Sequence, residues 1–162
     1  MKSSRFILGV LVLVLLTSVI VACGQASASK MQPPAKRVIT LAAIEPKGST
    51  TVEKEPFPSE ALPEGGGYAL VKPDDKGTWV VETYRWDSST VVVNEGDDVT
   101  LEVIGINGKE HPTTIEGYNV NFAVQRGKLT KVNFKADKPG IFKIICSAHQ
   151  PSMTADLVVL AR

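Results

Sequence analysis

Histidine, cysteine and methionine are scarce in this chain of 162 residues, which contains two histidines, two cysteines and three methionines. So few histidines exclude catalytic centres built from many imidazoles, and two cysteines allow at most one disulfide. The net charge argues against a nucleic-acid-binding protein. Removing residues 1–22 takes away two of the 18 basic residues and none of the 17 acidic ones, which leaves a net charge of −1. No basic surface for nucleic acid is expected at this balance.

Residues 1–22 have the organisation of an export signal. The basic segment 1–5 precedes the apolar run 6–21, and Ala22 stands directly before Cys23, as in a bacterial lipobox. We therefore predict a lipoprotein signal peptide over 1–22, lipidation of Cys23, and an extracytoplasmic protein anchored to the bacterial membrane through that lipid. An ordinary secretory signal or an uncleaved membrane anchor are the alternatives, and each also exports the chain.

Lipidation of Cys23 would leave Cys146 as an unpaired thiol in an oxidising compartment. Metal ligation protects such a thiol, whereas burial as a small hydrophobic residue would give it no chemistry. His149 and Met153 follow Cys146 closely, and His111 is the other histidine of the chain. Two imidazoles, one thiolate and one thioether form the ligand set of a blue-copper site. The residues therefore predict one bound copper ion.

We predict that the segment 23–67 is a lipid-anchored flexible tether with a possible edge strand. Residues 24–36 are small or polar, which is typical of a tether. Val38–Leu41 could form the edge strand. Residues 46–67 are rich in proline, glycine and glutamate, so we expect there a loop that lies over the domain or moves freely.

From residue 68 the pattern predicts β-strands throughout, with no amphipathic helix, and we place a single domain at 68–162. Val99, Leu101 and Val103 alternate with polar residues, so their strand should have one buried face. Short runs rich in branched and aromatic residues, separated by turn signals, occur at 68–71, 78–86, 90–93, 99–106, 120–124, 129–135, 141–146 and 155–160. Strands at this regular spacing favour an antiparallel sandwich.

The stretch 84–160 resembles a cupredoxin, the family of plastocyanin, amicyanin and pseudoazurin. The features that carry the resemblance are Gly96–Val99 before a long strand, His111, the turn Phe134–Gly140, and Cys146–His149. The resemblance implies an all-β, Greek-key antiparallel β-sandwich and a single type 1 copper. It makes His111, Cys146 and His149 equatorial ligands and Met153 the axial ligand, with Ser147, Ala148 and Thr113 next to them.

Two related copper sites fit the sequence less well. The copper-A domain of cytochrome c oxidase subunit II has the same separation of 35 residues between its first histidine and the cysteine as His111 and Cys146 have here, but its binuclear site needs a second cysteine where this chain has Gln150. A red-copper site would need a glutamate as first ligand, and Glu110 lies one residue too early.

This ligand set predicts an electron-transport protein that cycles between Cu(I) and Cu(II) and is not an enzyme, because both histidines and the free thiol are engaged by the metal. Its partners would be the membrane and transient redox proteins, such as a cytochrome or a terminal oxidase. A copper-trafficking module and a peripheral copper subunit of a respiratory complex are the alternatives. Few methionines remain for trafficking, since the exported chain has only Met31 and Met153.

Overall fold

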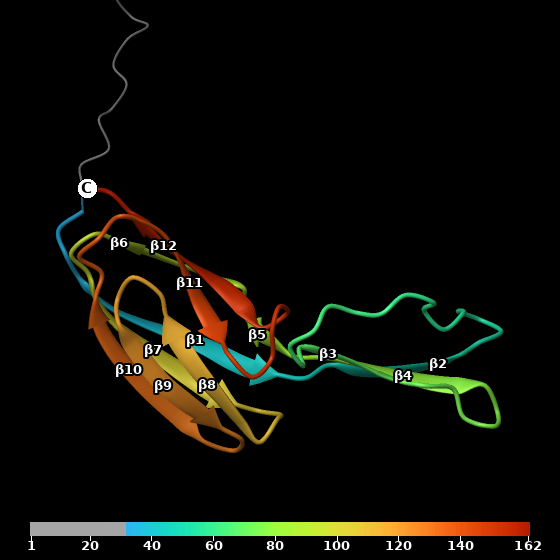
Figure 1. The fold of residues 1–162 in the computed structure, drawn as a ribbon. Coiled ribbons are helices and arrows are strands. Elements are labelled where there is room, and N and C mark those ends of the chain that lie inside the picture. Colours follow the sequence, from blue (N-terminus) through green and yellow to red (C-terminus); the bar gives the residue numbers. More distant parts are fainter. Residues whose placement is uncertain (1–31) are drawn as a thin grey trace, which may run out of the picture. The chain divides into compact units, whose positions relative to one another are not determined.

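A computed structural model describes residues 32–162, which contain β-strands and no α-helix. The signal peptide predicted at 1–22 and the lipidated Cys23 lie outside the described residues. Within 32–162 there is no helix of the length and apolarity that a membrane span requires. The body of the structure is an all-β sandwich with a smaller sheet extending from it (Figure 1).

Two sheets form the sandwich. The first has the strand order β10-β7-β1-β5 and the second has the order β6-β12-β11-β8-β9. Strands β1 and β7 run parallel, as do β6 and β12, whereas the other paired neighbours are antiparallel. The strands are β1 Lys36–Ile44, β5 Arg85–Asp87, β6 Thr90–Asn94, β7 Asp98–Gly105, β8 Glu110–Ile115, β9 Val120–Gln125, β10 Leu129–Lys135, β11 Gly140–Cys146 and β12 Thr154–Leu160.

The core lies between the two sheets and is built from alternate residues of their strands. On β7 the side chains of Val99, Leu101 and Val103 are at most 1% exposed, while the residues between them face outward. The strand β12 buries Ala155, Leu157 and Val159 in the same way. The predicted period of two therefore identifies the inner face of each sheet.

The strand β1 differs from the edge strand expected within the tether. It lies between β7 and β5, and its pairing with β7 extends over eight positions from Lys36 to Ala43. Leu41 and Ala43 are buried in the core. Residues 36–44 thus belong to the sandwich, although they lie before the domain boundary expected at 68. Whether a strand is central depends on its pairing partners. Those of β1 lie some 60 positions away, and the local sequence does not reveal them.

A second difference concerns β8, which the sequence pattern did not predict. Its inner face carries His111, Thr113 and Ile115, and all three are buried. Pro112 lacks an N–H group and obscured the strand, since proline within a run argues against a central strand. The proline is tolerated because the pairing of β8 with β11 begins only at Thr113.

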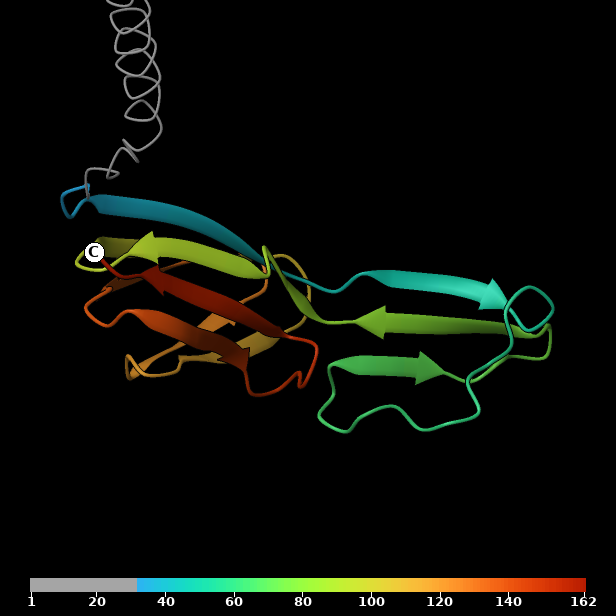
Figure 2. The ribbon, with the colours of Figure 1, turned by 90° about the horizontal axis from the view of Figure 1, so that it is seen from above.

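The remaining strands form a third sheet of order β2-β4-β3, comprising β2 Lys47–Thr51, β3 Tyr68–Val71 and β4 Thr78–Thr83. This sheet extends beyond one end of the sandwich (Figure 2). Residues 52–67 connect β2 to β3 and return to the sandwich at Gly65–Gly67, where Gly66 pairs with Gln150. The segment 46–67 therefore contains a strand and a contact with the domain.

The two ends of the described chain meet at the carboxylate of Asp97, which is fully buried. Asp97 accepts hydrogen bonds from the N–H of Ala35 at 2.9 Å and that of Asn94 at 3.1 Å. It also forms ion pairs with Arg37 at 3.1 Å and Arg162 at 2.6 Å. One buried anion thus joins the chain before β1 to the residues after β12.

Candidate metal centre

Strands β8 and β11 position the first two residues of the site. They pair antiparallel, with Cys146 opposite Thr113. His111 lies two positions before Thr113 and points to the same inner face, because alternate residues of a strand share a face. Both His111 and Cys146 have 0% exposure. Backbone pairing of two strands therefore brings together an imidazole and a thiol that are 35 residues apart.

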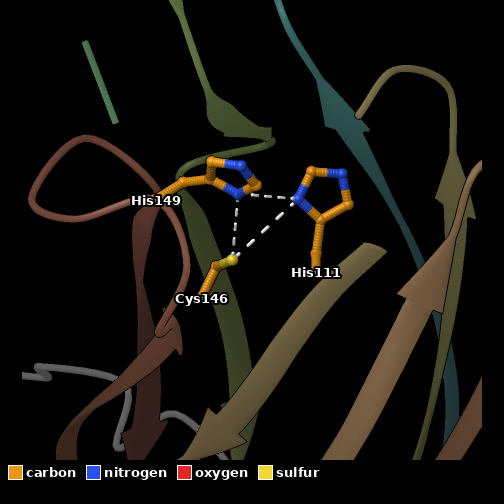
Figure 3. A group of neighbouring side chains, drawn as sticks. All are labelled: His111, Cys146 and His149. Carbon is orange, nitrogen blue, oxygen red and sulfur yellow. Dashed lines mark hydrogen bonds between the residues drawn. The ribbon is translucent and has the colours of Figure 1, made fainter. Parts of the chain in front are cut away.

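His149 completes a group of three converging side chains (Figure 3). Its Nδ1 lies 3.1 Å from Nδ1 of His111 and 3.4 Å from Sγ of Cys146. The distance between Cys146 Sγ and His111 Nδ1 is 3.9 Å. Among the described residues, His111, Cys146 and His149 form a group of histidine and cysteine side chains whose ligand atoms all lie within 4.8 Å of one another.

The orientation of His111 favours metal binding through Nδ1. Its Nε2 donates a hydrogen bond of 2.8 Å to the carbonyl oxygen of Asn107. A neutral imidazole with its proton on Nε2 has a free electron pair on Nδ1, and this atom faces the other two side chains. Three electron-pair donors converge here, two of them fully buried and the third, on His149, partly exposed, and they match the preference of copper for imidazole and thiolate ligands. The residues therefore fit the predicted ion.

Burial and hydrogen bonding act in opposite directions on the thiol. Desolvation raises the pKa of Cys146, while hydrogen bonds from the backbone N–H groups of Ala148 and His149 to the sulfur lower it, and burial prevails. Burial also lowers the pKa of His149, with a further contribution from His111. Both shifts favour uncharged side chains, so a cation in the site would meet a neutral imidazole and would compete with the thiol proton.

The predicted axial ligand, Met153, lies at the end of the same loop. Its side chain is fully buried and packs in the core cluster that also contains Cys146. Its carbonyl accepts a hydrogen bond of 3.1 Å from the N–H of Cys146, and its own N–H donates one of 3.0 Å to His149. The backbone thus holds Met153 next to two of the proposed ligands, and axial ligation by its sulfur stays a prediction.

Ser147, rather than Thr113, connects the two segments that carry the ligands. The N–H of Ser147 donates a 2.9 Å hydrogen bond to the carbonyl of Pro112, and its hydroxyl reaches the same oxygen at 3.5 Å. The hydroxyl of Thr113 donates instead to the carbonyl of His111 at 2.9 Å. Both predicted neighbours therefore support the site, each through the backbone of β8.

Sequence reasoning missed Tyr84, which follows β4. Its ring stacks on the imidazole of His149 with a centroid distance of 3.8 Å and an interplanar angle of 17°. Its hydroxyl hydrogen-bonds the side chain of Glu45, and this bond, together with burial, raises the pKa of Tyr84 to about 12. Nothing in the local sequence marked this tyrosine, because the contact depends on how the chain returns from the third sheet.

Ala148→Pro is expected to lower the reduction potential of the copper-loaded protein. Proline has no N–H, so the substitution removes one of the hydrogen bonds that withdraw electron density from the Cys146 sulfur. Voltammetry of the two proteins measures the difference. Ala148→Ser keeps the N–H and serves as the control, and an unchanged or raised potential in Ala148→Pro would contradict this account.

No protein-family model matches this chain. A curated relative, nitrous-oxide reductase of Cupriavidus necator, is 40% identical over 58 residues, which are 34% of this chain and 9% of the reductase. Among solved structures, the copper nitrite reductase from Nitrosomonas europaea matches with a TM-score of 0.51 and 19% identity over 78% of this chain and 42% of that one. Auracyanin A, a blue copper protein from Chloroflexus aurantiacus, matches with a TM-score of 0.40 and 18% identity over 46% of this chain and 88% of its own.

The chain thus spans less than half the length of the two reductases it matches. At 19% identity, the likeness to the nitrite reductase is one of fold. Together with the geometry of His111, Cys146 and His149, it defines the chain as a protein of cupredoxin fold with a site for a single type 1 copper ion.

Proposed function

We propose that this protein is an extracytoplasmic, membrane-tethered, mononuclear blue-copper electron-transfer protein. The observation that carries the proposal is the convergence of His111 Nδ1, Cys146 Sγ and His149 Nδ1 at separations between 3.1 and 3.9 Å. When bound there, copper supplies a one-electron couple between Cu(I) and Cu(II).

The surroundings of the ligands suit this role because they resist rearrangement. His111 and Cys146 lie on neighbouring strands and are fully buried. The ring of His149 is held between Tyr84 on one face and the other ligands at its Nδ1 edge. Ligands that move little between two oxidation states keep the reorganisation energy small, which a rapid electron carrier requires.

Electron transfer without catalysis is favoured by the residue inventory. The sequence contains two histidines, and both belong to the proposed site. With Cys146 and Met153 the site would be saturated, and an open coordination position is what a metal needs to bind and activate a substrate. The activities of the larger copper enzymes are therefore not part of this proposal.

Burial of three of the four proposed ligands also favours a carrier over a trafficking module. His111, Cys146 and Met153 each have 0% exposure and His149 is partly exposed, so an accepting protein would reach only one of the four proposed ligands directly. Anchoring through Cys23 would keep the domain at the membrane surface, where its partners would be transient redox proteins such as a cytochrome or a terminal oxidase. A permanent place in a respiratory complex is the alternative that co-purification would reveal.

Spectroscopy of the Cu(II)-loaded protein tests the proposal. An intense visible thiolate-to-copper band with narrow copper hyperfine splitting in the spin-resonance spectrum is the expected result. A mixed-valence signal spread over two copper ions, or a spectrum without the intense band, would contradict a mononuclear blue site. Reversible voltammetry then separates a carrier from a trafficking protein, because only a carrier needs rapid, repeated oxidation and reduction.

A further inference from the structure

A glycine segment from outside the core of the sandwich lies against the loop that carries His149. This segment, Gly65–Gly67, is called the strap here. The N–H of Gly67 donates a 3.0 Å hydrogen bond to the carbonyl of Gln150, and the N–H of Gln150 donates one of 2.8 Å to the carbonyl of Gly65. The hydroxyl of Ser152 donates a 2.7 Å bond to the carbonyl of Gly67. The N–H and the carbonyl of Gln150, the residue after His149, are therefore both hydrogen-bonded to the strap.

The closeness of this contact explains why the strap consists of glycine. A Cβ atom on Gly65 would lie 2.6 Å from the carbonyl oxygen of Gln150, and one on Gly67 would lie 2.7 Å from the carbonyl oxygen of His149. Real Cβ contacts are longer than this, so a side chain at either position would push the loop away. Gly66 has a φ of 74°, and a Cβ atom at this position would lie 3.0 Å from the carbonyl oxygen of Ala148.

The strap also holds the ring that stacks on His149. The carbonyl of Gly67 accepts a 2.9 Å hydrogen bond from the N–H of Tyr84. Gly67 is thus joined both to Gln150, the residue after the ligand, and to Tyr84, which covers one face of the imidazole at 3.8 Å. Displacing Gly67 would therefore weaken two contacts that hold His149, the backbone contact at Gln150 and the ring contact with Tyr84.

We propose that the strap positions His149 as a metal ligand. It fixes the Cys146–Met153 loop in its ligating conformation before the metal arrives, and it slows the movement of His149 away from the bound metal. Gly65–Gly67 are positioning residues, since their contacts are with the loop backbone, with Ser152 and with Tyr84. This inference rests on the proposed copper site, and the experiment separates the two.

The substitution Gly67→Ala tests the strap with a close control. Neither Gly67 nor Gly48 has a positive φ, so alanine strains the backbone at neither position. The Cβ of Gly67→Ala would press on the ligand loop, whereas that of Gly48→Ala, in β2, would meet its nearest atom at 3.8 Å. The two variants differ in whether the new methyl group contacts the loop.

The first measurement is hydrogen exchange of the Gln150 amide in the metal-free protein. We expect faster exchange in Gly67→Ala than in the wild type and Gly48→Ala, because the acceptor at Gly65 is displaced. The second is the rate of copper release to an excess of a chelator. Release should be faster by about tenfold or more in Gly67→Ala, a size typical for residues that orient metal ligands, and unchanged in Gly48→Ala.

Ser152→Ala provides a second variant that adds no bulk and should fold normally. It removes the hydroxyl bond to Gly67 and should speed copper release in the same direction, by less than Gly67→Ala. Release rates within twofold of the wild type in both variants, or an unchanged Gln150 exchange rate in Gly67→Ala, would overturn the strap proposal. A wild-type protein that binds no copper would overturn the proposed function instead, while Gln150 exchange would still report on the strap.

Discussion

Replacing Cys146 by serine is expected to abolish the intense visible absorption of the Cu(II)-loaded protein and to weaken copper binding severely. The band arises from charge transfer between thiolate and copper, and no other cysteine lies within the described residues. A serine hydroxyl stays protonated at neutral pH and is a harder ligand than the soft thiolate that stabilises Cu(I). Absorption spectroscopy and a copper titration measure both effects.

A matched control for this substitution is Ile144→Val. Ile144 lies two residues earlier on β11, faces the same core and is also fully buried. The loss of one methylene there should lower the free energy of unfolding by about 1 kcal/mol and leave the copper spectrum intact. Persistence of the intense band in Cys146→Ser would refute the assignment of this residue as the thiolate ligand.

The largest loss of stability is expected from Asp97→Ala. The substitution removes the buried carboxylate that binds two arginines and two backbone N–H groups, and it leaves the guanidinium of Arg162 partly buried without its anion. Removing one partner of a buried ion pair lowers the free energy of unfolding by about 3–5 kcal/mol. Denaturant unfolding measures this. Asp98→Ala is the control, because Asp98 is 64% exposed in a weak ion pair of 3.8 Å and should contribute little.

Asp97 should also make stability depend on acidity in a defined range. Burial alone would raise its pKa, but hydrogen bonds from Ala35 and Asn94 and the contact with Arg37 outweigh it and lower the pKa from 3.8 to about 2. A lowered pKa in the folded state means that the contribution is complete above pH 3.8 and is lost as pH falls through about 2. The difference in unfolding free energy between the wild type and Asp97→Asn should therefore shrink over this interval, and a constant difference would contradict the assignment.

The parts of the site that depend on local pattern were predictable from sequence. Cys146 and His149 belong to one loop, and the alternation of Phe142, Ile144 and Cys146 indicates which way the thiol points. Ile144 and Cys146 are indeed buried on the inner face of β11. Residue type and resemblance identify His111, but the sequence does not predict its strand, because Pro112 within β8 argues against a central strand.

The parts that depend on distant backbone contacts were not predictable. The sequence predicts a loop where the strap lies, since three consecutive glycines indicate conformational freedom and do not show which segment they approach. The stacking of Tyr84 on His149 also depends on the path of the chain through the third sheet. In both cases the information lies in how segments far apart in sequence meet.

The buried carboxylate of Asp97 has a mechanical consequence. Asp97 precedes β7, whereas Asn107, which binds His111, follows it, so the two lie roughly 25 Å or more apart at ~3.3 Å per residue of strand. A pull applied through the residues before Pro33 would load the contacts of Ala35 and Arg37 with Asp97 first. Tension on the leading segment would thus be taken up at one end of the sandwich, while His111 and its partners at the other end keep their geometry.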